Sequence, residues 1–178
     1  MCIRDRERNI KYLQSYGIND FVINIHHFGG QILAFLAEND NFGANIEISN
    51  ESDELLETGG GLLFAKRFLE NEKTFLIMNV DILTDLNITN FINIHELKGG
   101  MVTLAVSDRD STRKLMFNDK MYLKGWKNLT TNKKTVVGGI FKLRELAFSG
   151  IHCVNSEIFT KITRTGKFSI VDLSLIHI

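Results

Sequence analysis

FLIMNVDILTD, residues 75–85, is the stretch that says most about the architecture of this chain. Its first four residues are all apolar, which is typical of a strand buried on both faces of a sheet. Asn79, Val80 and Asp81 follow at once. Because ligands of open α/β sheets bind beyond the carboxyl ends of the strands, we expect Asn79 and Asp81 at a ligand crevice. The alternative is a structural turn that Asp81 caps and in which Asn79 bonds nearby backbone.

Asp81 has the chemistry of a ligand for a hard divalent cation. Mg²⁺ is usually held by one or two carboxylates, while phosphate oxygens and water complete its octahedron. If residues 79–81 do face a crevice, Asp81 is the residue in this stretch that can hold such an ion.

Strands and helices alternate on both sides of this stretch. Strand patterns occur at 21–25, 44–49 and 101–106, and helical patterns occur at 7–16, 28–39, 62–69 and 87–97. Such alternation is typical of parallel βαβ units with helices on both faces of a sheet. The sequence therefore predicts an α/β fold.

The pattern changes after residue 113. Residues 114–126 read as a β-hairpin around Asn118, Asp119 and Lys120, and residues 129–135 read as a polar loop. A further strand is predicted at 146–154 and a helix at 155–163. Because no linker or internal repeat separates the two parts, we predict a single domain.

The second candidate site is LLETGGGLLFAK, residues 55–66. Its spacing matches neither the P-loop nor the G-x-G-x-x-G fingerprint. Glycines without Cβ let a flat ligand approach the backbone, and a helix amino terminus offers free N–H donors. Thr58 is placed to cap the following helix. A tight strand-to-helix turn explains the three glycines equally well.

The histidines and the central cysteine are interpreted as structural. His26 and His27 lack a Cys or carboxylate at ligand spacing, so we favour polar groups that position a loop over a zinc site. His152 lies in an apolar strand and is expected to be a hydrogen-bonded core residue. Cys153 beside it is expected to be a small buried hydrophobe.

The composition excludes several classes of protein. The 178 residues carry 21 Lys or Arg and 21 Asp or Glu, so net charge gives no attraction to nucleic acid or an anionic membrane. No apolar run approaches the ~20 residues of a spanning helix. The charged residues 1–9 are not typical of a signal peptide, and two cysteines do not make a disulfide framework. We expect a cytoplasmic protein.

Together these pieces resemble the sugar-1-phosphate nucleotidyltransferases, which include mannose-1-phosphate guanylyltransferases and N-acetylmuramate-1-phosphate uridylyltransferases. The matching stretches occur in family order, at residues 16–32, 55–65, 75–86, 101–117, 123–126, 147–154 and 166–173. The resemblance implies a Rossmann-like three-layer α/β/α domain with a mostly parallel central sheet. It also implies Mg²⁺-dependent transfer of a nucleoside monophosphate from a nucleoside triphosphate to a sugar 1-phosphate, with release of pyrophosphate.

The resemblance also assigns site residues. Asp81 matches the catalytic, metal-binding Asp of the family, and Gly150 matches a glycine near the sugar. The positions that match the nucleotide pocket are Thr58, Gly59, Gly60 and Asn79. Val80 departs from the family, which often has a smaller residue there.

Larger departures concern the ends of the chain. The family's G-x-G-T-R-L triphosphate loop is not found here, because the match begins near Glu7. A second metal-binding Asp is expected beyond the region that matches. Residues 1–6 and 174–178 resemble non-native tails. The chain contains no proline, which the absence of the Pro-bearing segment that follows the family's triphosphate loop would partly explain. We therefore expect a nucleotidyltransferase domain at 7–173, truncated at both ends and inactive by itself.

Two other functions compete with this interpretation. A non-catalytic nucleotide- or sugar-binding regulatory domain would share the same fold. A Rossmann dehydrogenase is disfavoured, because no G-x-G-x-x-G follows any predicted strand. The base, the sugar and the oligomeric state do not follow from the sequence.

Overall fold

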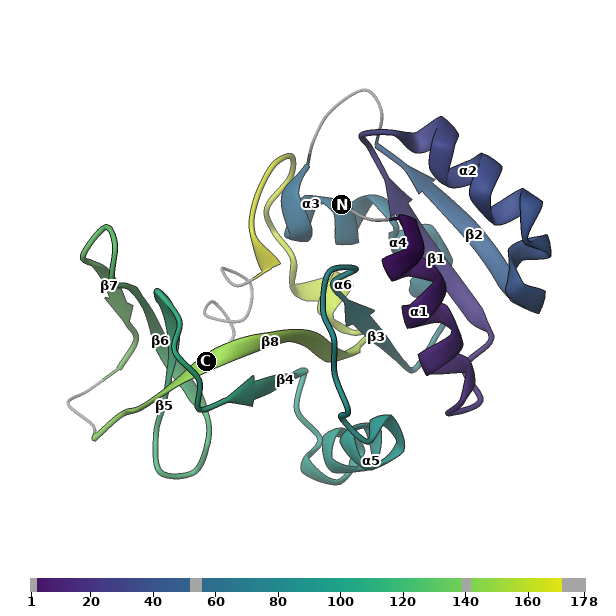
Figure 1. The fold of residues 1–178 in the computed structure, drawn as a ribbon. Helices are drawn as coiled ribbons and strands as arrows, with labels where there is room; N and C mark the ends of the chain where they lie inside the picture. Colours follow the sequence, from purple (N-terminus) through teal and green to yellow (C-terminus); the bar gives the residue numbers. More distant parts are fainter. Residues whose placement is uncertain (1–2, 52–55, 139–141, 171–178) are drawn as a thin grey trace.

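The structure is a computed structural model that describes residues 3–51, 56–138 and 142–170. Its helices are α1 (Ile3–Gln14), α2 (Gly29–Glu38), α3 (Glu57–Phe64), α4 (Lys66–Leu69), α5 (Ile88–Lys98), α6 (Ile158–Lys161) and the 3₁₀ turn η1 (Asp40–Gly43). Its strands are β1 (Asp20–Ile25), β2 (Asn45–Asn50), β3 (Thr74–Met78), β4 (Val102–Ser107), β5 (Arg113–Phe117), β6 (Leu123–Asn128), β7 (Lys133–Val136) and β8 (Arg144–Asn155). Figure 1 shows their arrangement, and the predicted α/β fold is confirmed.

The first βαβ unit is parallel, as predicted. β1 pairs with β2 in a register that runs from Asp20 opposite Asn45 to Ile25 opposite Asn50. α2 makes the crossover between the two strands and buries Ile32 against them. The two strands form a sheet of their own.

The prediction of a mostly parallel central sheet is wrong for the part of the chain that the structure describes. The larger sheet has six strands, and each of its pairings is antiparallel. The cause is β8, whose 12 residues pair with β3 on one side and with β4 on the other. The crossover through α5 leaves β3 and β4 pointing the same way, but β8 lies between them.

Helices cover both faces of the larger sheet, so its side chains alternate between two cores. Ile151 and Cys153 of β8 pack in one cluster with α1 and α5. Val154 of β8 and Phe75 of β3 pack in another with α3 and α6. α1 also contributes Ile10 to the core of the small sheet, so this helix joins the two sheets. The predicted burial of Cys153 is confirmed.

Three local features differ from the sequence predictions or extend beyond them. Part of the polar loop predicted at 129–135 is the exposed edge strand β7. The cap predicted at Thr58 is wrong, because α3 begins at Glu57 and the Thr58 hydroxyl instead accepts a hydrogen bond from the Ile170 N–H. Residues 3–6, which were predicted to belong to a tail, form the first turn of α1, whereas 1–2 and 174–178 lie outside the described residues.

Candidate functional site

The loop after β3 brings two predicted site residues side by side. The Asn79 N–H donates to the Gly150 carbonyl of β8 over 2.9 Å. Gly150 has φ +80, and a Cβ added to it would lie 2.6 Å from the Ile82 side chain and 3.5 Å from Asn79 Cβ. The glycine is therefore required by both its backbone conformation and the close approach of the loop.

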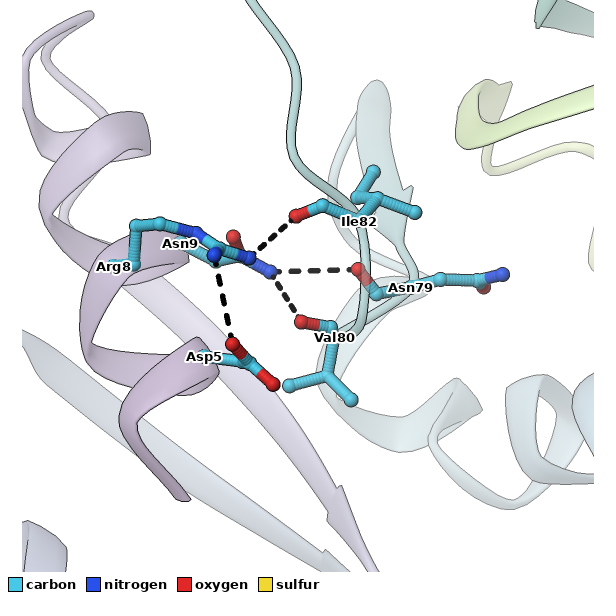
Figure 2. Close-up of polar contacts among 6 residues, drawn as sticks. All are labelled: Asp5, Arg8, Asn9, Asn79, Val80 and Ile82. Carbon is cyan, nitrogen blue, oxygen red and sulfur yellow. Dashed lines mark hydrogen bonds and ion pairs between the residues drawn. The ribbon is translucent and has the colours of Figure 1, made fainter. Parts of the chain in front are cut away.

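Asp81 projects from this loop without a structural role. It is exposed, and its carboxylate has no hydrogen-bond or ion-pair partner among the described residues. The Asn79 side chain is also exposed and points away from α1 (Figure 2). The alternative of a turn capped by Asp81 therefore does not describe this loop.

A free carboxylate at the end of β3 fits a cation that is held mainly by other ligands. No group of three or more His, Cys, Asp or Glu residues is placed to hold a metal within residues 3–51, 56–138 and 142–170. Mg²⁺ does not need such a group, because phosphate oxygens and water supply most of its ligands. Asp81 is the residue of this loop that would hold it.

The loop is held in place from α1, by side chains that the sequence analysis did not single out. Asn9 Nδ2 donates to the Val80 carbonyl over 3.0 Å and lies 3.4 Å from the Asn79 carbonyl. Arg8 donates to the Ile82 carbonyl over 2.7 Å (Figure 2). Three carbonyls around Asp81 thus face α1, which leaves the Asp81 carboxylate in solvent.

Tyr12, one turn further along α1, holds the other end of this loop. Its hydroxyl donates to the Leu86 carbonyl. Burial, together with neighbouring Tyr16 and Asp85, raises the pKa of Tyr12 to about 12. The phenol therefore stays protonated and remains a donor at neutral pH.

We expect Asn9→Ala to loosen this loop. The variant leaves two carbonyls without their donor, so the free energy of unfolding should fall by about 1–2 kcal/mol. Asn9→Asp should lower the free energy of unfolding further than Asn9→Ala does, because it places a carboxylate against the same carbonyls. Denaturant unfolding measures both, with the exposed Asn19→Ala as the matched control. Equal stability of the Asn9 and Asn19 variants would show that the contacts in Figure 2 do not hold the loop.

The glycine turn packs against the chain itself. The N–H groups of Gly59 and Gly60 both point to the Phe168 carbonyl, at 2.8 and 3.3 Å. A Cβ on Gly59 would lie 2.3 Å from the Phe168 ring, and one on Gly60 would lie 2.4 Å from the Gly166 carbonyl oxygen. These N–H groups are therefore not free to bind phosphate, and the missing side chains make room for residues 166–168.

A buried carboxylate behind the turn was missed by the sequence analysis. Glu51 is 4% exposed, and it accepts a hydrogen bond from Asn24 over 2.7 Å. A Cβ on Gly61 would lie 2.5 Å from the same carboxylate. His26 Nδ1 donates to the Glu51 carbonyl over 2.6 Å, which confirms the loop-positioning role predicted for it. The feature of the sequence that could have indicated this buried carboxylate is Asn24, a polar residue within the apolar run 21–25.

His152 is buried, as predicted, but the prediction that it is hydrogen-bonded is wrong. It is 2% exposed, and neither ring nitrogen has a partner among the described residues. Its ring lies against Phe148, with 4.6 Å between centroids. Burial lowers the pKa of His152 to about 4, so it is neutral in the folded protein.

The neutral state of His152 predicts a loss of stability in mild acid. An unfolded histidine titrates near 6.5, so below that pH the unfolded chain binds a proton that the folded chain does not. Stability should therefore fall as the pH drops from 6.5 towards 4, by about 2 kcal/mol between pH 7 and pH 5 from this residue alone. His152→Met should remove this part of the slope. Urea unfolding at both pH values measures it, and an unchanged slope would contradict the prediction.

No helix among the described residues has the length and apolar character needed to cross a membrane.

Comparison with known sequences supports the resemblance seen in the motifs. No family model matches the chain. Mannose-1-phosphate guanyltransferase of Gibberella zeae is 32% identical over 100 residues, which are 55% of this chain and 27% of that protein. The probable glucose-1-phosphate cytidylyltransferase of Bacillus subtilis is 24% identical over 157 residues, covering 78% of this chain and 62% of its own length. N-acetylmuramate alpha-1-phosphate uridylyltransferase of Neisseria meningitidis is 38% identical over 77 residues, which are 43% of this chain and 33% of that protein.

The fold is shared with solved structures. HddC from Yersinia pseudotuberculosis, in complex with GMP-PN, superposes with a TM-score of 0.71 at 17% identity, over 92% of this chain and 67% of that one. A putative glucose-1-phosphate thymidylyltransferase from Bacillus anthracis superposes with a TM-score of 0.71 at 15% identity, over 90% of this chain and 64% of that one.

Together the comparisons confirm the predicted resemblance to sugar-1-phosphate nucleotidyltransferases. This chain spans less than two thirds of the length of each curated relative described above. Those relatives are named for different bases and sugars, so they do not single out a substrate.

Proposed function

We propose that this chain carries part of the active site of a cytoplasmic, Mg²⁺-dependent sugar-1-phosphate nucleotidyltransferase. The reaction would join a nucleoside monophosphate from a nucleoside triphosphate to a sugar 1-phosphate and release pyrophosphate. One observation carries the proposal. The unpaired Asp81 carboxylate lies in a loop that also places Asn79 beside Gly150, at the carboxyl end of β3.

Each residue of that loop has a proposed task. Asp81 would hold Mg²⁺, which when bound offsets negative charge that develops on the phosphates. Asn79 would contact the nucleotide with its exposed amide. Gly150, which the family resemblance places near the sugar, would act there by letting the loop of Asn79 and Ile82 pack closely against β8. Asn9 and Arg8 would keep the Asp81 carboxylate in one place, because fixed groups stabilise developing charge without reorganising.

Thr58, Gly59 and Gly60 are proposed as nucleotide contacts on the family resemblance. Gly59 and Gly60 are buried against residues 166–168, and their N–H groups are occupied by the Phe168 carbonyl. The turn is therefore not a phosphate cradle, and its two glycines would shape the wall beside base and ribose by seating residues 166–168. Thr58 is exposed at the start of α3, where a ligand can reach it.

A pyrophosphate-release assay tests the proposal. The full-length product of the gene that encodes this chain is incubated with Mg²⁺, each nucleoside triphosphate, and mannose, glucose or N-acetylmuramate 1-phosphate. We expect release with at least one pair, and none from the 178-residue chain alone. Nucleotide binding by the full-length protein without turnover on any pair would favour the regulatory domain, which no present observation favours.

A further inference from the structure

The zero net charge of the chain conceals two regions of opposite charge. Residues 113–144 contain nine Lys or Arg and one Asp, which gives a net charge of +8. We call this region, which includes β5, β6 and β7, the basic arm. Residues 20–50 contain four Asp or Glu, all exposed, and no Lys or Arg, which gives −4. We call this region, which includes β1, α2 and β2, the acidic unit.

The two regions do not neutralise one another within one molecule. In Figure 1 the strands β5, β6 and β7 of the basic arm extend from one end of the molecule, and β1, α2 and β2 form the opposite end. Exposed charges farther apart than about 10 Å are largely screened at ordinary salt concentration. Each region therefore presents its charge to other molecules.

The basic arm also contains repulsion that the fold does not fully relieve. Lys114 lies opposite Lys127, and Lys127 lies opposite Lys134, on three adjacent strands. Like charges placed directly opposite in a sheet are destabilising. Glu145 pairs with Lys127 at 2.5 Å, whereas Lys134 has no ion-pair partner among the described residues.

Each region ends in an edge strand whose outer side pairs with no other described strand. The four residues of β7 are all exposed and include Lys133 and Lys134. β2 pairs only with β1 and exposes Glu47 near its middle. A free edge can add a strand from another chain, and lysines on an edge normally prevent this. They would repel a second β7 but would complement an edge that carries Glu47.

We propose that copies of this chain associate head to tail, with the β7 edge of one copy against the β2 edge of the next. The opposite charges of the basic arm and the acidic unit select this pairing over contact between two identical surfaces. A head-to-tail contact leaves one basic arm and one acidic unit free, so association continues beyond a dimer unless the ring closes. This inference does not rest on the proposed function.

A nucleic acid is the other partner that would suit the basic arm. The acidic unit makes a second copy of the chain the better partner. Every copy carries both regions, so the complementary negative surface is always present at the same concentration as the basic arm. The chain as a whole has no net positive charge, so there is no general attraction of a nucleic acid to the molecule.

Sedimentation velocity of the 178-residue chain over a range of concentrations tests the proposal. We expect the sedimentation coefficient to rise with concentration at low salt and not in 1 M salt, where the screening length is about 3 Å. Lys133→Glu with Lys134→Glu, and separately Glu47→Lys, should each abolish the rise. Lys98→Glu with Lys161→Glu changes charge equally outside the basic arm and should leave the rise intact.

Two rescue experiments separate this contact from a general charge effect. Mixing the β7 variant with the Glu47→Lys variant should restore association, because each retains the edge that the other has lost. Combining all three changes in one chain should also restore association, because the charges of the two edges are then exchanged. Near-native circular dichroism shows that each variant is folded. A chain that is monomeric at every concentration, or rescue in neither experiment, would overturn the proposal. The proposal would also be overturned if the chain stays monomeric and binds poly(U) RNA, and if the β7 variant loses that binding.

Discussion

On the proposed function, Asp81→Ala should lower the turnover of the full-length protein by at least about 10³-fold, equivalent to about 4 kcal/mol of transition-state stabilisation. The carboxylate has no partner among the described residues, so its removal breaks no contact that supports the fold. The melting temperature should therefore stay within about two degrees of the parent, since surface changes of this kind rarely exceed ±0.5 kcal/mol. Initial rates of pyrophosphate release at several Mg²⁺ concentrations measure the effect.

Asp85→Asn is the matched control for that prediction. Asp85 is an exposed carboxylate four residues further along the same loop, and it faces the end that Tyr12 holds. Its loss should leave turnover within about twofold, since a remote surface charge contributes little at ordinary salt. Comparable losses in both variants would mean that the loop needs negative charge in general and that Asp81 is not the metal ligand.

The local elements were largely predictable because their signals are local. The run 75–78 is a strand followed by Asn79 and Asp81, and β3 ends at Met78 in the structure. The order of strands was not predictable in the same way. A reading of alternating strands and helices assumes that consecutive strands become neighbours, whereas β8 enters between β3 and β4 from far along the chain.

The candidate site likewise has features that could be predicted from the sequence and features that could not. Asn79, Asp81 and Gly150 were identified from strand ends and family motifs, and the structure places Asn79 against Gly150. The contacts of Asn9 with the loop join residues about 70 positions apart, and an Asn in an amphipathic helix gives no local indication of them. A mechanism read only from motifs would therefore omit the groups that hold the loop.

Gly59→Ala and Gly60→Ala should each destabilise the protein by about 3 kcal/mol, against the usual trend for helices. Ala in place of Gly within a helix normally stabilises by about 1 kcal/mol. Here the added Cβ would lie 2.3 Å from the Phe168 ring or 2.4 Å from the Gly166 carbonyl oxygen, and overpacking of that kind costs about 1–3 kcal/mol or more. Gly30→Ala in α2 is the control, because nothing lies within 4 Å of its added Cβ.

The partner of each clash decides whether it can be relieved. Phe168→Ala removes the ring that opposes Gly59 but leaves the Phe168 carbonyl oxygen, which would lie 2.9 Å from the added Cβ. The double variant Gly59→Ala with Phe168→Ala should therefore be less destabilised than the sum of the two single changes, without full recovery of stability. The same change should not rescue Gly60→Ala, because its obstacle is the Gly166 backbone. Nucleotide affinity of the double variant, in the full-length enzyme, then separates packing from binding. If that affinity stays low where stability has partly recovered, the Gly59 surface contacts the nucleotide; if affinity recovers with stability, the turn serves only to seat residues 166–168.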